Sequence, residues 1–350
     1  MTNAYQEGAV RIGQLGVGRA GKMHAKILCT RVSQLFIADP YPGRAQEVKA
    51  ELESIAGCAE VTIAQVEELE QGVGAGANLD ALVITSPTDV HADQIIAGAE
   101  QGIPVFCEKP VSTSLAETQR ARREVAGRVP VAIGFQRRFD DAYRLARQHV
   151  RDGEVGELRR VIMHTMDQAP APRSFLAASG GIYVDCLVHD FDVLRWVTGQ
   201  EVEELFCYGT DLGLADFADF NDPAETVMVL KMAGNVLVTA SSSRFNGHGY
   251  DVRMELHGTE KTDVVGMDAK LPLRSLEGVS YPEGEPWTDF IARFAVCYQR
   301  EIEAFLILVE EGGSPASGLD DAVAALEIAE AAKLSYREHR PVALAELRNA

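Results

Sequence analysis

The chain has 350 residues, of which 46% are hydrophobic and 24% charged, and its formal net charge is −19. This length exceeds what one hydrophobic core usually serves, so the composition predicts a globular protein of two domains. The acidic balance argues against non-specific binding to nucleic acid and against an anionic membrane surface.

The cysteines and the N-terminus bear on the compartment. The six cysteines are scattered and form no C-x-x-C pair, which predicts neither a zinc site nor a disulfide framework and favours a reducing compartment. No apolar run is as long as a membrane span, and the N-terminus is too polar for a signal peptide. Together these features predict a cytoplasmic protein that does not enter the membrane.

Strand-like apolar runs alternate with helical patterns through the first third of the chain. The strand-like runs fall at about 9–18, 33–39, 79–85, 102–108 and 130–135, and the helical patterns at about 21–30, 43–54, 89–101 and 113–126. Strands that are apolar throughout, with helices between them, are typical of a parallel sheet covered on both faces. The sequence therefore predicts a doubly wound α/β domain of the Rossmann type over residues 1–134.

The remaining chain has a different pattern. Strand-like runs with little helix between them fall at 159–166, 202–209, 226–232, 235–245, 250–258 and 261–266, and two helices are predicted at about 288–311 and 319–338. This order predicts an α+β domain over residues 135–350, with a mostly antiparallel open sheet and helices on one face. Because large apolar sheet faces seldom stay exposed, we expect sheet-to-sheet homodimers or homotetramers.

A glycine-rich motif, GVGRAG, follows the first predicted strand and opens the first predicted helix. Gly16 would make the tight turn, Gly18 would let the backbone approach a pyrophosphate, and Gly21 would allow close helix–strand packing. The helix N-terminus would offer N–H donors to the anion, which adds Arg19 and Ala20 to the predicted cofactor contacts. This context favours a dinucleotide-binding loop over a glycine-rich turn in an unrelated α/β fold.

Asp39 ends the second predicted strand, where a carboxylate can accept hydrogen bonds from an adenosine ribose. The same charge would repel a 2′-phosphate, so NAD is favoured over NADP. The alternative role for Asp39 is to cap the following helix. We interpret Arg44 as a residue of a solvated helix face, and it does not alter the preference for NAD.

Polar residues follow the third and fourth predicted strands. The carboxyl ends of such strands are where doubly wound folds bind ligands, although turn and capping roles are an alternative for these residues. Lys109 ends an apolar strand before a proline and is expected to point at the ligand crevice, unless it forms an ion pair with a neighbour. His91 fits a structural role as well as a functional one. The predicted cofactor contacts here are Thr85, Ser86, Thr88, His91, Glu108 and Lys109.

The apolar segment GGIYVDCLVHDFDVLRW contains Asp185, His189 and Asp192 at positions i, i+4 and i+7. On a helix this spacing places the three side chains on one face. Because an unpartnered buried charge is costly, this face must line a pocket, or the three groups must satisfy one another. A metal ion is disfavoured, because no second histidine pair or cysteine supports it.

Four motifs occur together in a specific order. They are G-x-G-x-x-G-x-x-H from Gly16 to His24, Asp39, E-K-P from Glu108 to Pro110, and D-x-x-x-H-D from Asp185 to Asp190. In this combination the chain resembles the glucose–fructose oxidoreductase, inositol dehydrogenase and MocA (Gfo/Idh/MocA) family over nearly its whole length, and its inositol dehydrogenase branch most. The resemblance implies a cis Lys109–Pro110 bond.

The resemblance also implies that Lys109, Asp185 and His189 meet at the nicotinamide ring of NAD as catalytic residues. His189 suits the role of proton acceptor, because imidazole exchanges protons near neutral pH. Asp185 would hold substrate hydroxyls and bias the histidine, and Lys109 would stabilise charge on the reacting oxygen. The implied reaction is NAD-dependent oxidation of a secondary alcohol of an inositol-like cyclic polyol to a ketone.

The substrate itself is less constrained. Asp167 and Ala169 stand where the inositol dehydrogenases are expected to have histidine and asparagine. Asp192 either binds a hydroxyl or pairs with an arginine such as Arg195, and Tyr250 either contacts substrate or fills the core. The expected substrate-binding residues are Lys109, Asp167, Asp185, His189, Asp192 and Tyr250. A dehydrogenase of another sugar or amino sugar and an NAD-dependent glycosidase stay open, whereas a non-catalytic sensor is disfavoured because the three catalytic residues are present.

Overall fold

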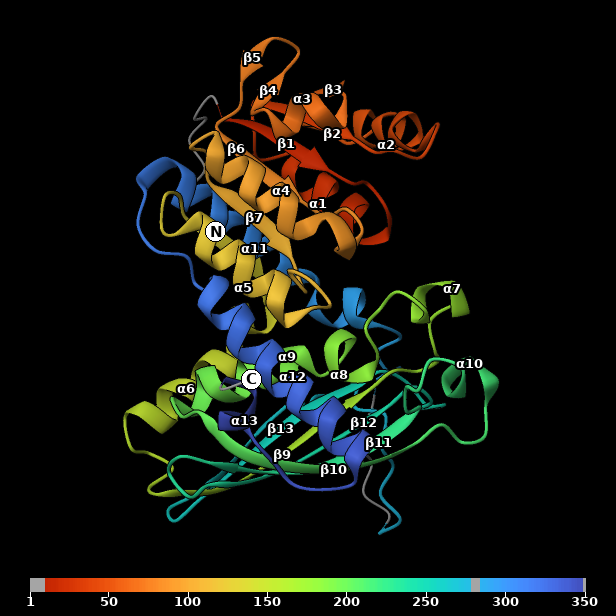
Figure 1. Cartoon of the computed structure of the whole chain (residues 1–350), viewed down its shortest axis with the longest axis vertical. Helices are drawn as coiled ribbons and strands as arrows, with labels where there is room; N and C mark the ends of the chain where they lie inside the picture. The colour runs from red at the N-terminus through yellow and green to blue at the C-terminus, as the bar shows by residue number, and fades with distance from the viewer. Residues whose placement is uncertain (1–9, 278–283, 349–350) are drawn as a thin grey trace. The chain divides into compact units, whose positions relative to one another are not determined.

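The computed structural model describes residues 10–277 and 284–348 (Figure 1). The chain divides into two compact units. The first comprises the chain up to Phe135 together with Tyr298–Val323, and the second comprises Gln136–Cys297 together with the chain from Ala324 onward.

The membership of Tyr298–Val323 differs from the expectation, which assigned the whole chain after residue 134 to the second domain. Contacts within the first unit explain the difference. Arg31 pairs with Glu303 at 2.9 Å, and the backbone N–H of Ile133 donates to the carbonyl of Ser317 at 3.0 Å. These contacts join residues far apart in the sequence, so the segment completes the first unit.

The first unit contains a six-stranded sheet in the order β3-β2-β1-β6-β7-β8, and every neighbouring pair is parallel. Its strands are β1 (Arg11–Leu15), β2 (Gln34–Ala38), β3 (Glu60–Ile63), β6 (Ala81–Ile84), β7 (Val105–Glu108) and β8 (Val131–Gly134). The predicted parallel sheet is confirmed. Strand β3 was not predicted, because it is a half-exposed edge strand without a long apolar run.

Helices separate these strands and complete the doubly wound arrangement. They are α1 (Arg19–Leu28), α2 (Arg44–Glu53), α3 (Val66–Glu70), α4 (Thr88–Glu100) and α5 (Leu115–Val125), and a small hairpin joins β4 (Val73–Gly74) to β5 (Ala77–Asn78). Most of α11 (Phe290–Glu311) also belongs to this unit, although it comes after all of its strands in the sequence. Figure 1 shows α4 and α5 running beside the sheet. The strand order reverses between β1 and β6, which is where folds of this kind bind their ligands.

The second unit contains a seven-stranded sheet in the order β14-β13-β9-β12-β11-β10-β15. Its strands are β9 (Leu158–Met166), β10 (Val202–Thr210), β11 (Glu225–Met232), β12 (Leu237–Ser243), β13 (Asp251–Gly258), β14 (Thr262–Val265) and β15 (Val342–Ala343). All neighbouring pairs except β9 and β12 are antiparallel, so the prediction of a mostly antiparallel sheet is confirmed.

Helices cover one face of this sheet (Figure 1). The long ones are α6 (Asp141–Arg151), α9 (Val188–Thr198) and the last part of α12 (Leu319–Glu338), and the short ones are α8 (Ile182–Asp185) and α13 (Leu344–Arg348). Two more short helices, α7 (Arg173–Leu176) and α10 (Ala215–Ala218), pack against each other through Leu176 and Phe217. The prediction that two late helices cover the face is wrong for α11, because most of that helix belongs to the first unit.

The other face of the sheet carries exposed apolar side chains. Along β11 buried and exposed residues alternate strictly, as expected for a strand packed on one side. Tyr208, Val227, Val229 and Leu237 point outward from β10, β11 and β12, and each is at least half exposed. Across the described residues, no helix combines the length and apolar character needed to cross a membrane.

Candidate active site

The glycine-rich loop between β1 and α1 has the backbone that its motif predicts. Gly16 has a φ of 84°, and a Cβ there would lie 2.5 Å from the Cα of Ser86. A Cβ on Gly21 would lie 2.3 Å from the carbonyl oxygen of Gly16, whereas the nearest atom to a Cβ on Gly18 is 3.9 Å away. The loop therefore has no space for a side chain at Gly16 or Gly21 but has free space beside Gly18. A pyrophosphate could lie in this space against the N-terminus of α1, where Arg19 and Ala20 form the first turn.

A cavity of about 160 Å³ adjoins this loop. Asp39 lies in it at the end of β2, and its carboxylate accepts hydrogen bonds from the backbone N–H groups of Val17 and Tyr41, each at 2.9 Å. The guanidinium of Arg44 lies 3.4 Å from both Asp39 oxygens and stacks over the ring of Tyr41 at 4.1 Å. The Arg44 side chain is 39% exposed at the start of α2, as its interpretation as a solvated residue expects, but it also lines the cavity beside Asp39.

Thr85 and Ser86 both line the cavity, but their hydroxyls are used within the protein. Thr85 Oγ1 donates to the carbonyl of Gly16 at 2.6 Å, and Ser86 Oγ donates to Gln94 at 2.6 Å. Thr88 begins α4, whose N-cap is Pro87. The main role of the Thr85 side chain is therefore to hold the glycine-rich loop in place through its hydrogen bond to Gly16.

The E-K-P motif lies at the carboxyl end of β7. The Lys109–Pro110 bond is cis, as predicted. Glu108 Oε1 lies 2.7 Å from Nε2 of His24, and its other oxygen accepts the backbone N–H of Lys109 at 3.1 Å. The histidine of the glycine motif and the glutamate of E-K-P are thus partners, and together they hold the backbone from which Lys109 projects.

His91 joins two of these loops. Its Nδ1 lies 2.9 Å from the carbonyl oxygen of Pro110, and its Nε2 lies 2.8 Å from that of Ser86. The ring is 2% exposed, and burial lowers the pKa of His91. Both ring nitrogens face backbone carbonyl oxygens, and a neutral imidazole donates to one of them, so His91 has the geometry of a structural residue, while its contact with the cofactor stays a prediction.

The apolar segment that contains Asp185 and His189 forms two helices instead of one. Helix α8 ends at Asp185 and α9 begins at Val188. Between them the N–H of Leu187 donates to the carbonyl of Ile182 at 3.0 Å, a bond that spans five residues and widens the turn. From Ile182 to Leu194 every residue is buried except Asp185 and His189, so these are the two side chains of this segment that solvent reaches.

Asp192 has a different environment, and its predicted role in binding a hydroxyl is wrong. It is 1% exposed and accepts a hydrogen bond from Nε of Arg138 at 2.9 Å. The neighbouring Asp190 pairs with Arg137 at 3.0 Å, and both side chains are 1% exposed. The alternative partner named for Asp192, Arg195, pairs instead with a surface glutamate.

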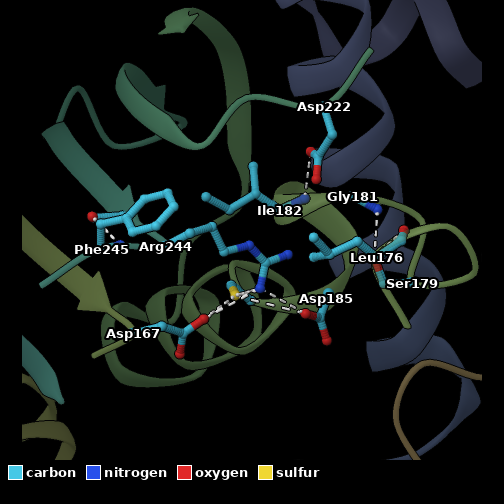
Figure 2. Close-up of polar contacts among 11 residues, drawn as sticks. Asp167, Leu176, Ser179, Gly181, Ile182, Asp185, Asp222, Arg244 and Phe245 are labelled. Carbon is cyan, nitrogen blue, oxygen red and sulfur yellow. Dashed lines mark hydrogen bonds and ion pairs between the residues drawn. The ribbon is translucent and has the colours of Figure 1, made fainter. Parts of the chain in front are cut away.

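Asp167 and Asp185 meet at one arginine that the sequence analysis did not identify. Nη1 of Arg244 lies 2.9 Å from an oxygen of Asp185 and 3.2 Å from an oxygen of Asp167 (Figure 2). Burial raises the pKa of Asp167, Arg244 opposes that rise, and Asp185 adds to it. The position of Arg244 in SRFNGHGYD, just before Tyr250, is the only sequence signal that could have suggested it.

Tyr250 immediately precedes β13 and lies in the interior of the second unit. It is 6% exposed, and its backbone N–H donates to the carbonyl of Trp287 at 2.7 Å. Burial raises the pKa of Tyr250, so the phenol stays neutral. Among the described residues, no group of three or more histidine, cysteine or acidic side chains is arranged to hold a metal ion.

Comparison with known proteins agrees with these features. Residues 10–131 match the model of an oxidoreductase family with an NAD-binding Rossmann fold, and residues 143–262 match the GFO/IDH/MocA C-terminal domain. An inositol 2-dehydrogenase of Rhizobium meliloti is 32% identical over 96% of this chain and 99% of its own length. A scyllo-inositol 2-dehydrogenase (NAD(+)) of Bacillus subtilis is 33% identical over 97% of both chains.

Solved structures give the same result. A myo-inositol dehydrogenase from Corynebacterium glutamicum has a TM-score of 0.83 and 29% identity, covering 96% of this chain and 99% of its own. A scyllo-inositol dehydrogenase from Lactobacillus casei, solved with NAD(H) and scyllo-inositol, has a TM-score of 0.82 and 25% identity, covering 97% and 100%. The chain therefore belongs to the Gfo/Idh/MocA oxidoreductase family, and residues 10–131 are its NAD-binding domain.

Proposed function

We propose that this protein is an NAD-dependent dehydrogenase that oxidises one secondary hydroxyl of an inositol-type cyclic polyol to a ketone. The observation that carries the proposal is the selective exposure of Asp185 and His189 in an otherwise buried segment. The names of the relatives, inositol 2-dehydrogenase and scyllo-inositol 2-dehydrogenase, support the class of substrate.

The residues of the first unit fit the cofactor. The loop at Gly16, Gly18 and Gly21 would hold the diphosphate, and Asp39 with Arg44 would lie at the adenosine ribose. NAD, when bound, supplies the acceptor for the hydride that leaves the carbinol carbon. The E-K-P backbone, fixed by His24 and Glu108, would present Lys109 at the reacting end of the cofactor.

The catalytic residues handle the proton and the charge. His189 would accept the hydroxyl proton, and Asp185 would hold an adjacent hydroxyl and orient the imidazole. Lys109 would donate a hydrogen bond to the same oxygen as negative charge develops on it. Asp167 would accept hydrogen bonds from hydroxyls further along the ring, and Tyr250 is proposed as a wall of the substrate site.

The charges around Arg244 favour a neutral polyol over an anionic sugar. Asp167 and Asp185 share this one guanidinium, which leaves an excess of acceptors and of negative charge facing the ligand. Hydroxyl groups satisfy such acceptors, whereas a carboxylate or phosphate on the substrate would be repelled.

A screen for NADH formation tests the proposal. Purified protein with NAD should produce NADH with at least one of myo-, scyllo- or chiro-inositol, and more slowly with glucose or glucosamine. Asp185→Asn, which keeps the size of the side chain, serves as the inactive control. Activity with sugars alone, or hydrolysis of a glycoside without net NADH, would contradict the assignment to inositol-type polyols.

We also propose that the protein is a cytoplasmic homodimer or homotetramer that assembles through the open sheet face. The outward stripe of Tyr208, Val227, Val229 and Leu237 supports this, because apolar patches of this kind are usually covered. All six cysteines are free thiols, which suits a reducing compartment.

Light scattering of wild type and of Val227→Lys tests the assembly. Wild type should be oligomeric, and the variant should have a lower mass. A monomeric wild type at micromolar concentration would contradict it.

A further inference from the structure

Arg244 contacts both acidic residues of the proposed substrate site. This residue follows β12 and is 1% exposed, and its backbone N–H donates to the carbonyl of Ala224 at 2.9 Å. Its Nη1 reaches Asp185 at the end of α8 and Asp167 in the loop after β9, as Figure 2 shows. One nitrogen therefore connects two carboxylates that come from separate elements.

The other nitrogens of Arg244 make no comparable pair. Nε and Nη2 are buried without a hydrogen-bond partner among the described residues. Arg138 differs, since its Nε and Nη2 both bind the single carboxylate of Asp192. Apart from the Cys186 sulfur, 2.9 Å from Nη1, the side-chain hydrogen bonds of Arg244 all go to Asp167 and Asp185. A buried cation without partners is energetically costly, so the two carboxylates stabilise the buried guanidinium of Arg244.

Without a cation, the two carboxylates would oppose each other's ionisation. Two acidic groups that share a buried site tend to keep one proton between them. Asp222, which lies before β11 and is buried, adds a third carboxyl in this region, and burial raises its pKa as it does that of Asp167. A guanidinium stays protonated at any pH at which a protein is folded, so Arg244 is a permanent positive charge among these three acids.

We propose that Arg244 is a positioning residue that keeps Asp167 and Asp185 ionised and correctly oriented, so that Asp185 can orient His189 and both acids can accept hydroxyl hydrogen bonds. This inference rests on the proposed function, because it takes Asp185 and His189 as catalytic. It goes beyond that function because it assigns control of the ionisation and orientation of the two carboxylates to Arg244. In this role Arg244 neither accepts the substrate proton nor contacts the cofactor.

The first test is the pH profile of kcat/KM for polyol oxidation in Arg244→Met. The methionine fills similar space without charge, so a proton should stay on the acidic pair near neutral pH. The acid limb of the profile should move up by about one to two pH units, which lowers the rate roughly 10–100-fold at pH values below the wild-type limb and by a smaller factor at neutral pH. The affinity for NAD should change less than about twofold, because the cofactor-binding residues lie in the first unit.

Three further variants separate charge from packing. Arg244→Lys restores the cation and should return the acid limb to within about half a pH unit of wild type. Arg244→Met combined with Asp167→Asn removes one of the opposing carboxylates and should move the limb back toward acid. Arg253→Met, which removes another largely buried arginine that pairs with Asp251 on β13, should leave the limb unchanged. If Arg244→Met does not fold, Arg244→Gln serves in its place.

A measurement without substrate distinguishes this inference from the proposed function. Infrared difference spectra of the full chain should show a carboxyl group that titrates near neutral pH in Arg244→Met and disappears from that range in the double variant. If wild type oxidises no polyol but this carboxyl titrates as described, the proposed function fails and the assignment of Arg244 stands. If wild type is active and folded Arg244→Met keeps both its pH limb and its carboxyl spectrum, the assignment of Arg244 is wrong.

Discussion

The glycine-rich loop of the first unit and the acidic cluster of the second unit build their sites in different ways. The loop around Gly16 uses backbone groups and lacks side chains where a ligand must approach, and even Asp39 is held mainly by backbone N–H donors. The cluster around Arg244 consists of a buried guanidinium and two partly exposed carboxylates that pair with it over long sequence separations. A site built from backbone groups depends on particular residues that are adjacent in the sequence. A site built from charged side chains depends on partners that are brought together only by the tertiary fold.

The largest effect expected from this comparison is the loss of chemistry without loss of cofactor binding. His189→Ala should lower kcat roughly 10²–10⁴-fold, because it removes the proposed proton acceptor, while NAD binding should be unchanged. Stopped-flow measurement of NADH formation, with NAD titrations alongside, tests this. A near-wild-type rate with intact NAD binding would place the chemistry elsewhere.

The second prediction concerns the inner face of α9. Asp192→Ala should lower the free energy of unfolding by about 3–5 kcal/mol, because it leaves the buried guanidinium of Arg138 without its partner. Glu201→Ala, which breaks the more exposed pair with Arg195, should cost about 1 kcal/mol or less. Urea unfolding measures both variants. An Asp192→Ala protein with wild-type stability and a raised KM for the polyol would restore the role in hydroxyl binding that the structure argues against.

The third prediction concerns cofactor choice. Asp39 should favour NAD over NADP by at least about tenfold through repulsion of the 2′-phosphate. Asp39→Ser should narrow or reverse this preference, since Arg44 beside it would then face the phosphate without its carboxylate partner. Adding Arg44→Ala to Asp39→Ser should weaken the use of NADP again. The ratio of kcat/KM values for the two cofactors is the readout, and equal use of both by wild type would show that Asp39 does not control the choice.

The smallest expected effect is a pH dependence of stability from His91. Burial lowers the pKa of His91, so the unfolded chain binds a proton at this site more readily than the folded chain. Stability should therefore fall as the pH drops below about 6.5, by at most about 1.4 kcal/mol per pH unit from this group. The difference between wild type and His91→Gln, measured by urea unfolding between about pH 7.5 and 5.5, isolates the contribution. His339→Gln, at an exposed histidine, is the matched control, and an identical pH dependence in all three proteins would contradict the prediction.

These contrasts explain how much the sequence could predict. The parallel sheet, the glycine-rich loop and the exposure of Asp185 with His189 follow from local patterns, since each depends on residues within a few positions of one another. The partners of the acidic residues do not, because Arg138 is 54 residues from Asp192 and Arg244 is 59 residues from Asp185. The role of Asp192 was mispredicted for the same reason, because its place three residues after His189 on α9 gives no sign of the distant Arg138 that binds it.

The return of Tyr298–Val323 to the first unit has a consequence for biosynthesis. The ribosome completes the six parallel strands long before it delivers this segment, and domains generally begin to fold in the order in which they emerge. Strand β8 is an edge strand of the sheet, and until then its Ile133 lacks the hydrogen bonds to Ser317, while exposed strand edges promote association between chains. The nascent NAD-binding domain therefore has to wait for nearly the entire second unit to be synthesised, and this interval is when chaperones would matter most to the yield of folded enzyme.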